Sequence, residues 1–285
     1  MMERTLEIWT EKLPTSWAWT PCDYLGGTPE FVVNTAICAK DRFDEVIVYY
    51  DGPSGEYDGV YYMPRSMYEG RDIVLSCNSS PPLMGKYNIY WTNWDHQRDK
   101  NVMSFDERIV LSPYQKSVFG SNSRIVPHSL WPSQFKNPVK VRKQCLYSSS
   151  PDRGGEFLDS IWDEVYQETG ATLIKTYSSN ISEDEMVELY KSSEYWLHPC
   201  RGVEMFCIAA VKAQVARCIP VVVPNMALET TVKFGVKTTL DKYRDDLIHA
   251  LNYPPAVEDV DFGTWETVTE KLFENVKCSS PVVTA

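Results

Sequence analysis

Short apolar runs bounded by turn residues recur along the first half of the chain and predict its strands. They occupy residues 5–11, 44–52, 71–77, 86–93, 107–112 and 123–129. Residues 29–40 instead carry apolar side chains at helical spacing, which predicts a helix after an irregular stretch rich in proline and tryptophan. Short buried strands separated by helical or irregular connections indicate a parallel sheet covered on both faces.

Residues 131–143 interrupt this rhythm, and we interpret them as a linker between two domains. The segment holds two prolines and four basic residues and shows no strong periodicity. Beyond it, apolar runs predict strands at residues 143–150, 171–179, 194–200 and 219–225. The predicted helices alternate with these strands and then close the chain, at residues 155–170, 182–193, 205–216, 227–235, 241–252 and 264–277.

Local helix signals support this second alternation. Ser182 with Glu185 is a capping-box signal, and Gly170 is placed to end the preceding helix. The chain is therefore expected to be an α/β protein with two doubly wound, Rossmann-like parallel-sheet domains, residues 1–135 and 136–285. Because ligands of open parallel sheets bind beyond the carboxyl ends of the strands, we expect the domains to face each other across a binding cleft.

Charge narrows the classes of function. The 285 residues carry a net charge of −11, with a pI near 4.9. This acidic balance disfavours a broad basic surface for nucleic acid and still leaves room for a local phosphate pocket.

Targeting signals and cysteines point to a cytoplasmic protein. The first residues lack a basic segment followed by an apolar one, so no secretory signal peptide is expected. No apolar run approaches the roughly 18 residues that span a membrane. The eight cysteines show no metal-binding spacing, and several lie in apolar runs. We therefore expect free thiols in a reducing compartment.

Polar residues gather where the predicted strands of the second half end. Ser148, Ser149 and Ser150 stand before Arg153 and two glycines, between a strand and a helix start. Free amides at a helix start and a guanidinium favour an anion, most simply a phosphate, and an ordinary polar loop is the alternative. At the next strand end, Tyr177 offers either a flat surface for a base or a half-buried ring.

A lone carboxylate precedes a helix of small residues. Glu204 either complements the helix dipole, an effect under about 1 kcal/mol at a surface, or accepts hydrogen bonds from sugar hydroxyls. In the second case the amides of Phe206, Cys207 and Ile208 would face a diphosphate. The residues alone leave both interpretations open.

The first half offers an aromatic and polar cluster after one strand, formed by Trp91, Asn93, Trp94, Asp95 and His96. Aromatic faces beside polar groups suit a sugar or another ring-bearing acceptor, and a packed tryptophan with an Asp–His pair holding a loop is the alternative.

Two histidines and one Asp-Val-Asp triplet are not expected to take part in catalysis. His128 and His198 are classed as structural. The triplet Asp259-Val260-Asp261 has the look of a metal motif but lies in a linker before the last helix, so no metal is assigned to it.

The order of these segments resembles the C-terminal half of GT-B-fold glycosyltransferases, specifically family 4 (glycosyl transferases group 1). Arg153-Gly154 matches the basic-Gly pair that follows the first strand in that family, and Pro199 to Cys207 matches its P…EgFG element. Cys218-Ile219-Pro220 matches a later G.P, and Glu229 matches a later glutamate.

The first half resembles the same family. Gly26, Gly27 and Glu30 match an early GG..E loop, and FGTWETVTEKL (residues 262–272) resembles the terminal helix. The resemblance implies that this last helix, about residues 262–278, crosses back to the first domain. It also implies that the first domain lies on the acceptor side and that the second binds the nucleotide sugar.

The resemblance implies a retaining transfer from a UDP- or GDP-linked sugar to a carbohydrate or other hydroxyl acceptor, without a bound metal or other cofactor. Glu204 would orient the donor sugar, while Arg153 and helix amides offset the charge of the leaving diphosphate. The implied catalytic residues are Glu204, Arg153, His96 and Asp95. The implied donor-binding residues are Gly26, Gly27, Ser148, Ser149, Ser150, Arg153, Tyr177, Glu204, Met205, Phe206, Cys207, Ile208 and Lys212.

Two positions depart from the family pattern. Lys212 stands where the second glutamate of a Glu-x7-Glu pair usually touches the nucleotide ribose, and Ser148 stands where arginine is often found. We therefore expect Lys212 either to contact ribose or phosphate or to face solvent.

Other functions fit the same architecture. A sugar-nucleotide epimerase or a phosphorylase is the nearest enzyme alternative. A catalytically inactive module that binds a sugar or a partner chain is the second, and Lys212 supports it. A transferase acting on modified nucleic-acid bases is the third, and the acidic charge disfavours it.

Overall fold

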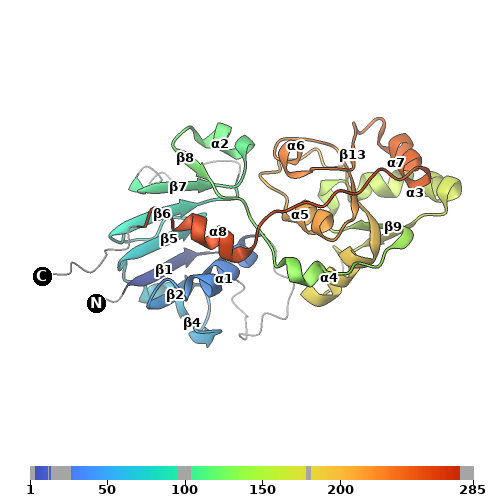
Figure 1. Cartoon of the computed structure of the whole chain (residues 1–285). Helices are drawn as coiled ribbons and strands as arrows, with labels where there is room; N and C mark the ends of the chain where they lie inside the picture. The colour runs from blue at the N-terminus through green and yellow to red at the C-terminus, as the bar shows by residue number, and fades with distance from the viewer. Residues whose placement is uncertain (1–3, 12, 14–26, 95–103, 178–180, 277–285) are drawn as a thin grey trace, which may run out of the picture.

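The computed structural model describes residues 4–11, 13, 27–94, 104–177 and 181–276. The chain forms two halves, each built on its own sheet, that lie side by side (Figure 1). The predicted α/β fold with two parallel-sheet halves is confirmed. Three residues of the predicted site, Gly26, Asp95 and His96, lie outside the described residues.

The first sheet has eight strands in the order β3-β4-β2-β1-β5-β6-β7-β8. They are β1 (Thr5–Thr10), β2 (Glu45–Tyr50), β3 (Gly55–Tyr57), β4 (Val60–Pro64), β5 (Ile73–Cys77), β6 (Tyr87–Trp91), β7 (Glu107–Val110) and β8 (Ser123–Ile125). All neighbours pair in parallel except β3 with β4. The central strands β2, β1, β5 and β6 are buried along almost their whole length, because a parallel sheet is covered on both faces.

The edge hairpin β3–β4 is a feature that the sequence reading missed. Asp58 and Gly59 join its strands, and both have positive φ, 51° and 74°. An Asp-Gly pair favours this two-residue turn because its backbone twist matches that of the flanking strands. The missed signal was therefore this dipeptide between two tyrosine-rich runs.

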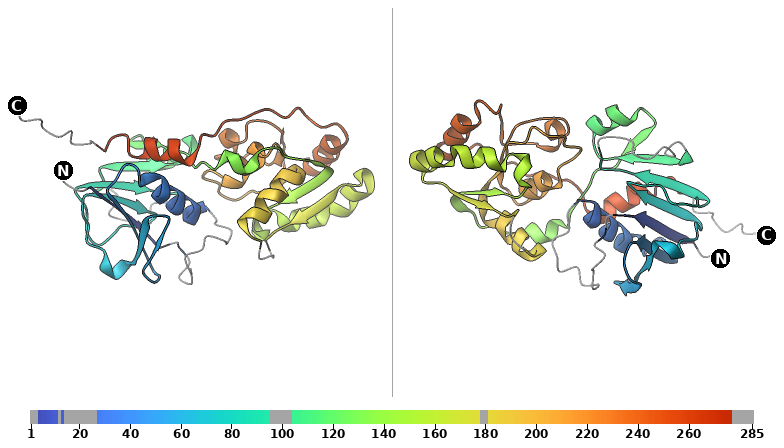
Figure 2. Two further views of the ribbon diagram at one scale, coloured as in Figure 1. Left: turned by 60° about the horizontal axis from the view of Figure 1, so that its bottom comes forward. Right: turned by 180° about the vertical axis from the view of Figure 1, so that it is seen from behind.

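Two helices from opposite ends of the described chain pack together on one face of the first sheet: α1 (Gly27–Ala39) and α8 (Trp265–Leu272). Figure 2 shows α8 against the first half in both views, although it follows the whole second half in sequence. Phe31 of α1 stacks on Trp91 of β6, with ring centroids 3.9 Å apart, and meets the edge of Trp265. A short helix, α2 (Pro113–Phe119), follows β7.

The second sheet is parallel throughout, in the order β10-β9-β11-β12-β13. Its strands are β9 (Val141–Tyr147), β10 (Thr172–Lys175), β11 (Ser193–His198), β12 (Ile219–Val222) and β13 (Val236–Lys237). Its helices are α3 (Gly155–Thr169), α4 (Glu183–Ser192), α5 (Ile208–Val215), α6 (Leu228–Thr231) and α7 (Tyr243–Asn252). The α3 and α7 side chains pack in one apolar cluster, whereas those of α4 and α5 belong to another, so helices cover both faces.

The helix ends follow the predicted signals where those signals are local. Ser182 and Glu185 form the predicted capping box at the start of α4, and Gly170 ends α3 in the left-handed conformation, with φ of 68°. Other boundaries differ. The predicted linker 131–143 contains a short 3-10 helix, Pro132–Phe135, and the first residues of β9.

The predicted helix 205–216 starts later than expected. The α5 helix begins at Ile208, because Cys207 adopts a left-handed conformation, with φ of 66°. Glu204, Met205 and Phe206 therefore belong to a buried loop that leads into the helix.

The two halves share one apolar cluster. It extends from the α1 and α8 face of the first sheet, through Phe206, to α4 and α5 on the second sheet. No helix in the described part of the chain combines the length and the apolar character needed to cross a bilayer.

Candidate functional site

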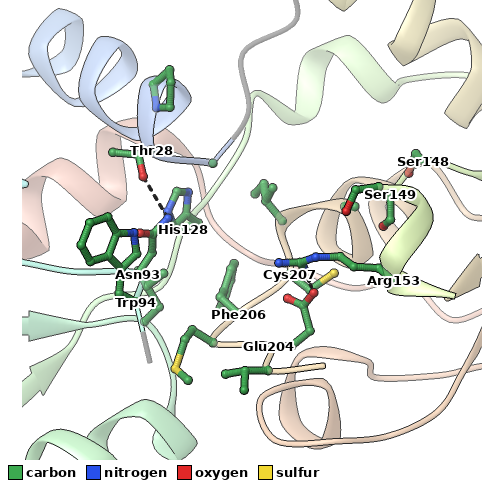
Figure 3. Close-up of a pocket in the computed structure, with 18 residues that line it drawn as sticks. Thr28, Asn93, Trp94, His128, Ser148, Ser149, Arg153, Glu204, Phe206 and Cys207 are labelled. Carbon is green, nitrogen blue, oxygen red and sulfur yellow. Dashed lines mark hydrogen bonds and ion pairs between the residues drawn. The ribbon is translucent and has the colours of Figure 1, made fainter. Parts of the chain in front are cut away.

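A cavity of about 720 Å³ lies between the two halves (Figure 3). The first half lines it with the first turn of α1 (residues 27–29), residues 93–94 after β6, Leu111 and His128. The second half contributes the loop after β9, with Ser148, Ser149, Ser150 and Arg153, and the segment 203–209 that leads into α5. The carboxyl ends of strands in both sheets therefore meet here, as the parallel topology predicts.

Arg153 and Glu204 form an ion pair on the wall of the second half (Figure 3). The Glu204 side chain is only 5% exposed, whereas that of Arg153 is 42% exposed. The carboxylate is thus held in the wall, and the guanidinium reaches from it toward the cavity.

Gly154 lets the two loops of this wall come together. It has φ of 106°, and a Cβ built on it would lie 2.7 Å from Cγ of Pro199. Any other residue would combine backbone strain with this clash. The glycine therefore allows the β9 loop, which holds Arg153, to pack against the segment that carries Glu204.

His198, the last residue of β11, stands behind this pair. Its ring stacks on Trp196, its Nδ1 lies 3.1 Å from the hydroxyl of Ser149, and its Nε2 lies 3.5 Å from Oε1 of Glu204. Burial, and then the charge of Arg153, lower the pKa of His198 to about 3. The imidazole is therefore neutral at pH 7, and a proton on Nε2 would face the carboxylate.

One cluster among the described residues has the spacing of a metal site. The ligand atoms of His198, Glu204 and Cys207 all lie within 4.8 Å of one another. Two features oppose a cation there. The guanidinium of Arg153 already pairs with the carboxylate, and burial raises the pKa of the Cys207 thiol to about 11.

The start of α5 opens on the same wall. Residues 207–209 line the cavity, and the first amides of a helix have no acceptor within the helix. Together with Arg153, these amides supply the two kinds of donor that bind a phosphate group. The side chains of Met205 and Phe206 are buried, so any contact of Phe206 with a diphosphate falls to its amide.

The wall of the first half is built from a neutral polar network. Thr28 Oγ1 accepts hydrogen bonds from the amide groups of Asn93 (3.0 Å) and Asn78 (3.2 Å). The side-chain oxygen of Asn78 in turn accepts the Asn93 backbone N–H (3.1 Å). The side-chain oxygen of Asn93 is buried and has no hydrogen-bond partner among the described residues. Figure 3 shows Asn93 and Trp94 across the cavity from Glu204.

His128 belongs to this wall too. Its ring stacks on Phe206 of the opposite half, with centroids 5.8 Å apart. Burial, and then the charge of Lys212, lower its pKa to about 3. Sequence reasoning classed both His128 and His198 as structural, and the structure puts them at the cavity and against Glu204. The available signal was their position directly after apolar runs.

Among the predicted donor-binding residues that the structure describes, two do not line the cavity. Tyr177 is 41% exposed and lies edge-on to Tyr147. The expectation that Lys212 can face solvent is wrong. Its side chain is 2% exposed and forms ion pairs with Glu30 and Glu183, because a buried ammonium requires opposite charge.

Ser148 and Ser149 line the cavity with hydroxyls that already have protein partners. Ser148 accepts a hydrogen bond from the indole of Trp196 and bonds to the Tyr190 hydroxyl. Ser149 bonds to His198. These contacts fix the β9 loop in place.

No protein-family model and no curated protein matches the sequence. Solved structures match over nearly the whole chain. Sucrose-phosphate synthase of Thermosynechococcus elongatus aligns with a TM-score of 0.64 at 11% identity, covering 95% of this chain and 98% of that one. HepE of Anabaena in complex with UDP and glucose aligns at 0.58 and 9% identity, covering 95% of both chains.

A third match is the catalytic domain of starch synthase IV of Arabidopsis thaliana, bound to ADP and acarbose. It aligns with a TM-score of 0.59 at 10% identity, again covering 95% of each chain. At such low identity the likeness shows a shared fold, the GT-B arrangement of two parallel-sheet halves.

Proposed function

We propose that this protein is a glycosyltransferase that moves a sugar from a nucleotide-diphosphate sugar to a hydroxyl acceptor. The observation that carries the proposal is the Arg153–Glu204 ion pair at the start of α5, in the wall of a cavity between two parallel-sheet halves. The cavity volume of about 720 Å³ lies in the range of ordinary small-molecule sites.

The wall of the second half suits the donor. Arg153 and the amides at the start of α5 bind the diphosphate, and they stabilise the charge that develops on it as the sugar departs. Glu204 accepts hydrogen bonds from sugar hydroxyls and fixes the reacting carbon. His198, neutral at pH 7, lies beside the carboxylate, with its Nε2 3.5 Å from Oε1 of Glu204, and does not take up a proton.

The wall of the first half suits the acceptor. Asn93 lines the cavity, and its side-chain oxygen, which has no hydrogen-bond partner within the described part of the chain, would accept a hydroxyl group; Trp94 adds an aromatic face. We therefore propose residues 1–135 as the acceptor side and residues 136–285 as the nucleotide-sugar domain, except for the terminal helix α8, which packs on the first half.

We propose a retaining transfer without metal, as the resemblance to family 4 implies. The arrangement of charge supports the metal-free part, because the guanidinium of Arg153 faces the place of the diphosphate. UDP- and GDP-linked sugars are the donors to test first, and a cytoplasmic location fits such donors.

A sugar-binding module without turnover is the second candidate. The burial of Lys212 favours it, because the resemblance puts a ribose-binding glutamate at that position. Such a module would bind the sugar nucleotide and leave it intact.

Calorimetry with UDP, GDP and ADP, followed by turnover of the matching sugar nucleotides, tests the proposal. We expect one nucleoside diphosphate to bind and its sugar nucleotide to be slowly hydrolysed, or transferred when an acceptor is present. Tight binding without turnover would favour the module, and no binding of any nucleotide would refute both.

A further inference from the structure

Three charged side chains from three helices meet inside the protein, behind the cavity. The ammonium of Lys212, in α5, lies 3.0 Å from Oε2 of Glu30 in α1 and 2.9 Å from Oε1 of Glu183 at the start of α4. The Glu30 and Lys212 side chains are 9% and 2% exposed. The Glu183 side chain is 24% exposed. We call Glu30, Glu183 and Lys212 the ion triad.

The two ion pairs of the triad differ in what they connect. Glu183 and Lys212 both belong to the second half, so their pair is local to it. Glu30 belongs to the first half, so its pair with Lys212 crosses from one half to the other.

The cross-half pair lies directly behind the two walls of the cavity. Glu30 follows the turn Gly27–Pro29, which lines the cavity from the first half. Lys212 is one helical turn beyond Ala209, the last residue that lines it from the second half. The ion pair between their side chains therefore joins the first turn of α1 to α5.

Lys212 supplies the positive charge that compensates the carboxylates of Glu30 and Glu183. Burial is the main cause that raises the pKa of Glu30; the positive charge of Lys212 opposes it, and the negative charge of Glu183 adds to it. Without the ammonium, the buried carboxylate of Glu30 would face the partly exposed carboxylate of Glu183 with no opposite charge between them, and moving the halves apart would relieve this.

We propose that Lys212 is a positioning residue that binds the two halves together and sets the width of the cavity. The ligand involved, a sugar nucleotide, rests on the proposed function, whereas the contact between halves does not. Lys212 thus acts through the position of α1 and touches no substrate.

Two matched variants separate the cross-half pair from the local one. Glu30→Ala and Glu183→Ala each remove one carboxylate and leave Lys212 with the other. Hydrogen exchange of residues 27–33 and 206–212, measured by mass spectrometry, reports the contact between α1 and α5. Small-angle scattering reports the radius of gyration.

We expect Glu30→Ala to speed exchange in both segments by at least tenfold and to increase the radius of gyration. Glu183→Ala should leave both segments as protected as in the wild type, with faster exchange confined to α4. If Glu30→Ala fails to fold, Glu30→Gln retains the shape of the side chain, removes its charge and should show a smaller effect of the same kind. Equal protection in the two variants, or wild-type protection in the folded Glu30 variant, would overturn the proposal.

Binding and turnover test the consequence for the site. Because Arg153 stays in place, the nucleoside diphosphate that binds the wild type should bind Glu30→Ala within about twofold. Transfer from the sugar nucleotide should fall about tenfold, since the opposite wall is displaced. Unchanged transfer despite opened halves would refute the positioning role. If the wild type transfers nothing, the proposed function fails, while the exchange experiment still decides whether Lys212 joins the halves.

Discussion

The two walls of the cavity differ in charge. The second half presents Arg153, paired with a buried Glu204, and the first amides of α5. The first half presents the Thr28–Asn93 network and the rings of Trp94 and His128, with no charged side chain among the described lining residues.

This difference shows what each wall can bind. A guanidinium beside the first amides of a helix attracts an anion, and a buried charge next to it has to be compensated by an opposite charge. An amide oxygen without a partner instead attracts a neutral donor such as a hydroxyl. One cavity can thus hold a charged donor and a neutral acceptor on opposite sides.

The largest effect is expected for Arg153→Ala. Because this variant removes the charged donor of the second wall, it should weaken nucleoside diphosphate binding by about 1.5–3 kcal/mol. It also leaves the buried carboxylate of Glu204 without its counter-charge, so the free energy of unfolding should decrease. Titration calorimetry and thermal melts measure both effects.

Arg217→Ala is the matched control. Arg217 also belongs to the second half, but it pairs with Asp259 on the surface away from the cavity. Its diphosphate affinity should equal that of the wild type. An equal affinity in folded Arg153→Ala would mean that the β9 loop is only a connector.

The two walls should respond alike to acid. His128 and His198 both have pKa values lowered to about 3, mainly by burial, with Lys212 and Arg153 respectively adding to the shift. Between pH 6.5 and 3 each imidazole binds a proton in the unfolded state but not in the folded state. The free energy of unfolding therefore decreases as pH falls. Each histidine should contribute about 1.4 kcal/mol per pH unit well below pH 6.5.

Urea unfolding of His128→Gln and His198→Gln between pH 7 and 4 measures these contributions. Each variant should lose less stability on acidification than the wild type does. The raised pKa values of Glu7 and Glu30 act in the opposite direction, and both carboxyls are retained in wild type and variants. A slope equal to that of the wild type would contradict the neutral, buried state of that histidine.

A smaller change in free energy is expected for Glu204→Gln. Diphosphate affinity should stay nearly intact, because Arg153 and the helix amides remain. Transfer from the sugar nucleotide should fall at least about tenfold, since the sugar loses the group that orients its reacting carbon. Glu188→Gln, on the surface of α4, should transfer normally. Full activity of Glu204→Gln with slightly lower stability would assign Glu204 to the helix dipole alone.

Sequence patterns predicted the second wall better than the first. Arg153 and Glu204 stand where a strand ends and a helix begins, and alternation along the chain locates such points. In the first half, the local signal for the β3–β4 hairpin was a single Asp-Gly dipeptide, which is easily overlooked. The contact of Thr28 with Asn93 joins residues 65 apart in sequence, and no local pattern encodes it.

The state of Lys212 was equally inaccessible to sequence reasoning. Its departure from the family pattern was visible, but its partner Glu30 lies 182 positions earlier, in the other half of the molecule. The neighbours of His198 could not be predicted for a related reason, because its closeness to Glu204 and Ser149 depends on how two loops fold together. Tertiary contacts between charged groups therefore had to come from the structure.

The smallest effect is expected for metal removal. One cluster in the second wall has the spacing of a metal site: His198, Glu204 and Cys207. This cluster is the observation that most directly opposes a metal-free transfer. The Arg153 guanidinium occupies the neighbourhood of the carboxylate, and the protonated thiol would have to lose a proton to bind an ion. We therefore expect nucleoside diphosphate affinity to stay within about twofold after dialysis against EDTA, close to the resolution of calorimetry. Cys207→Ser should behave in the same way with and without added zinc. A loss of binding on chelation that zinc restores in the wild type, but not in Cys207→Ser, would replace the guanidinium by a metal ion as the charge that holds the diphosphate.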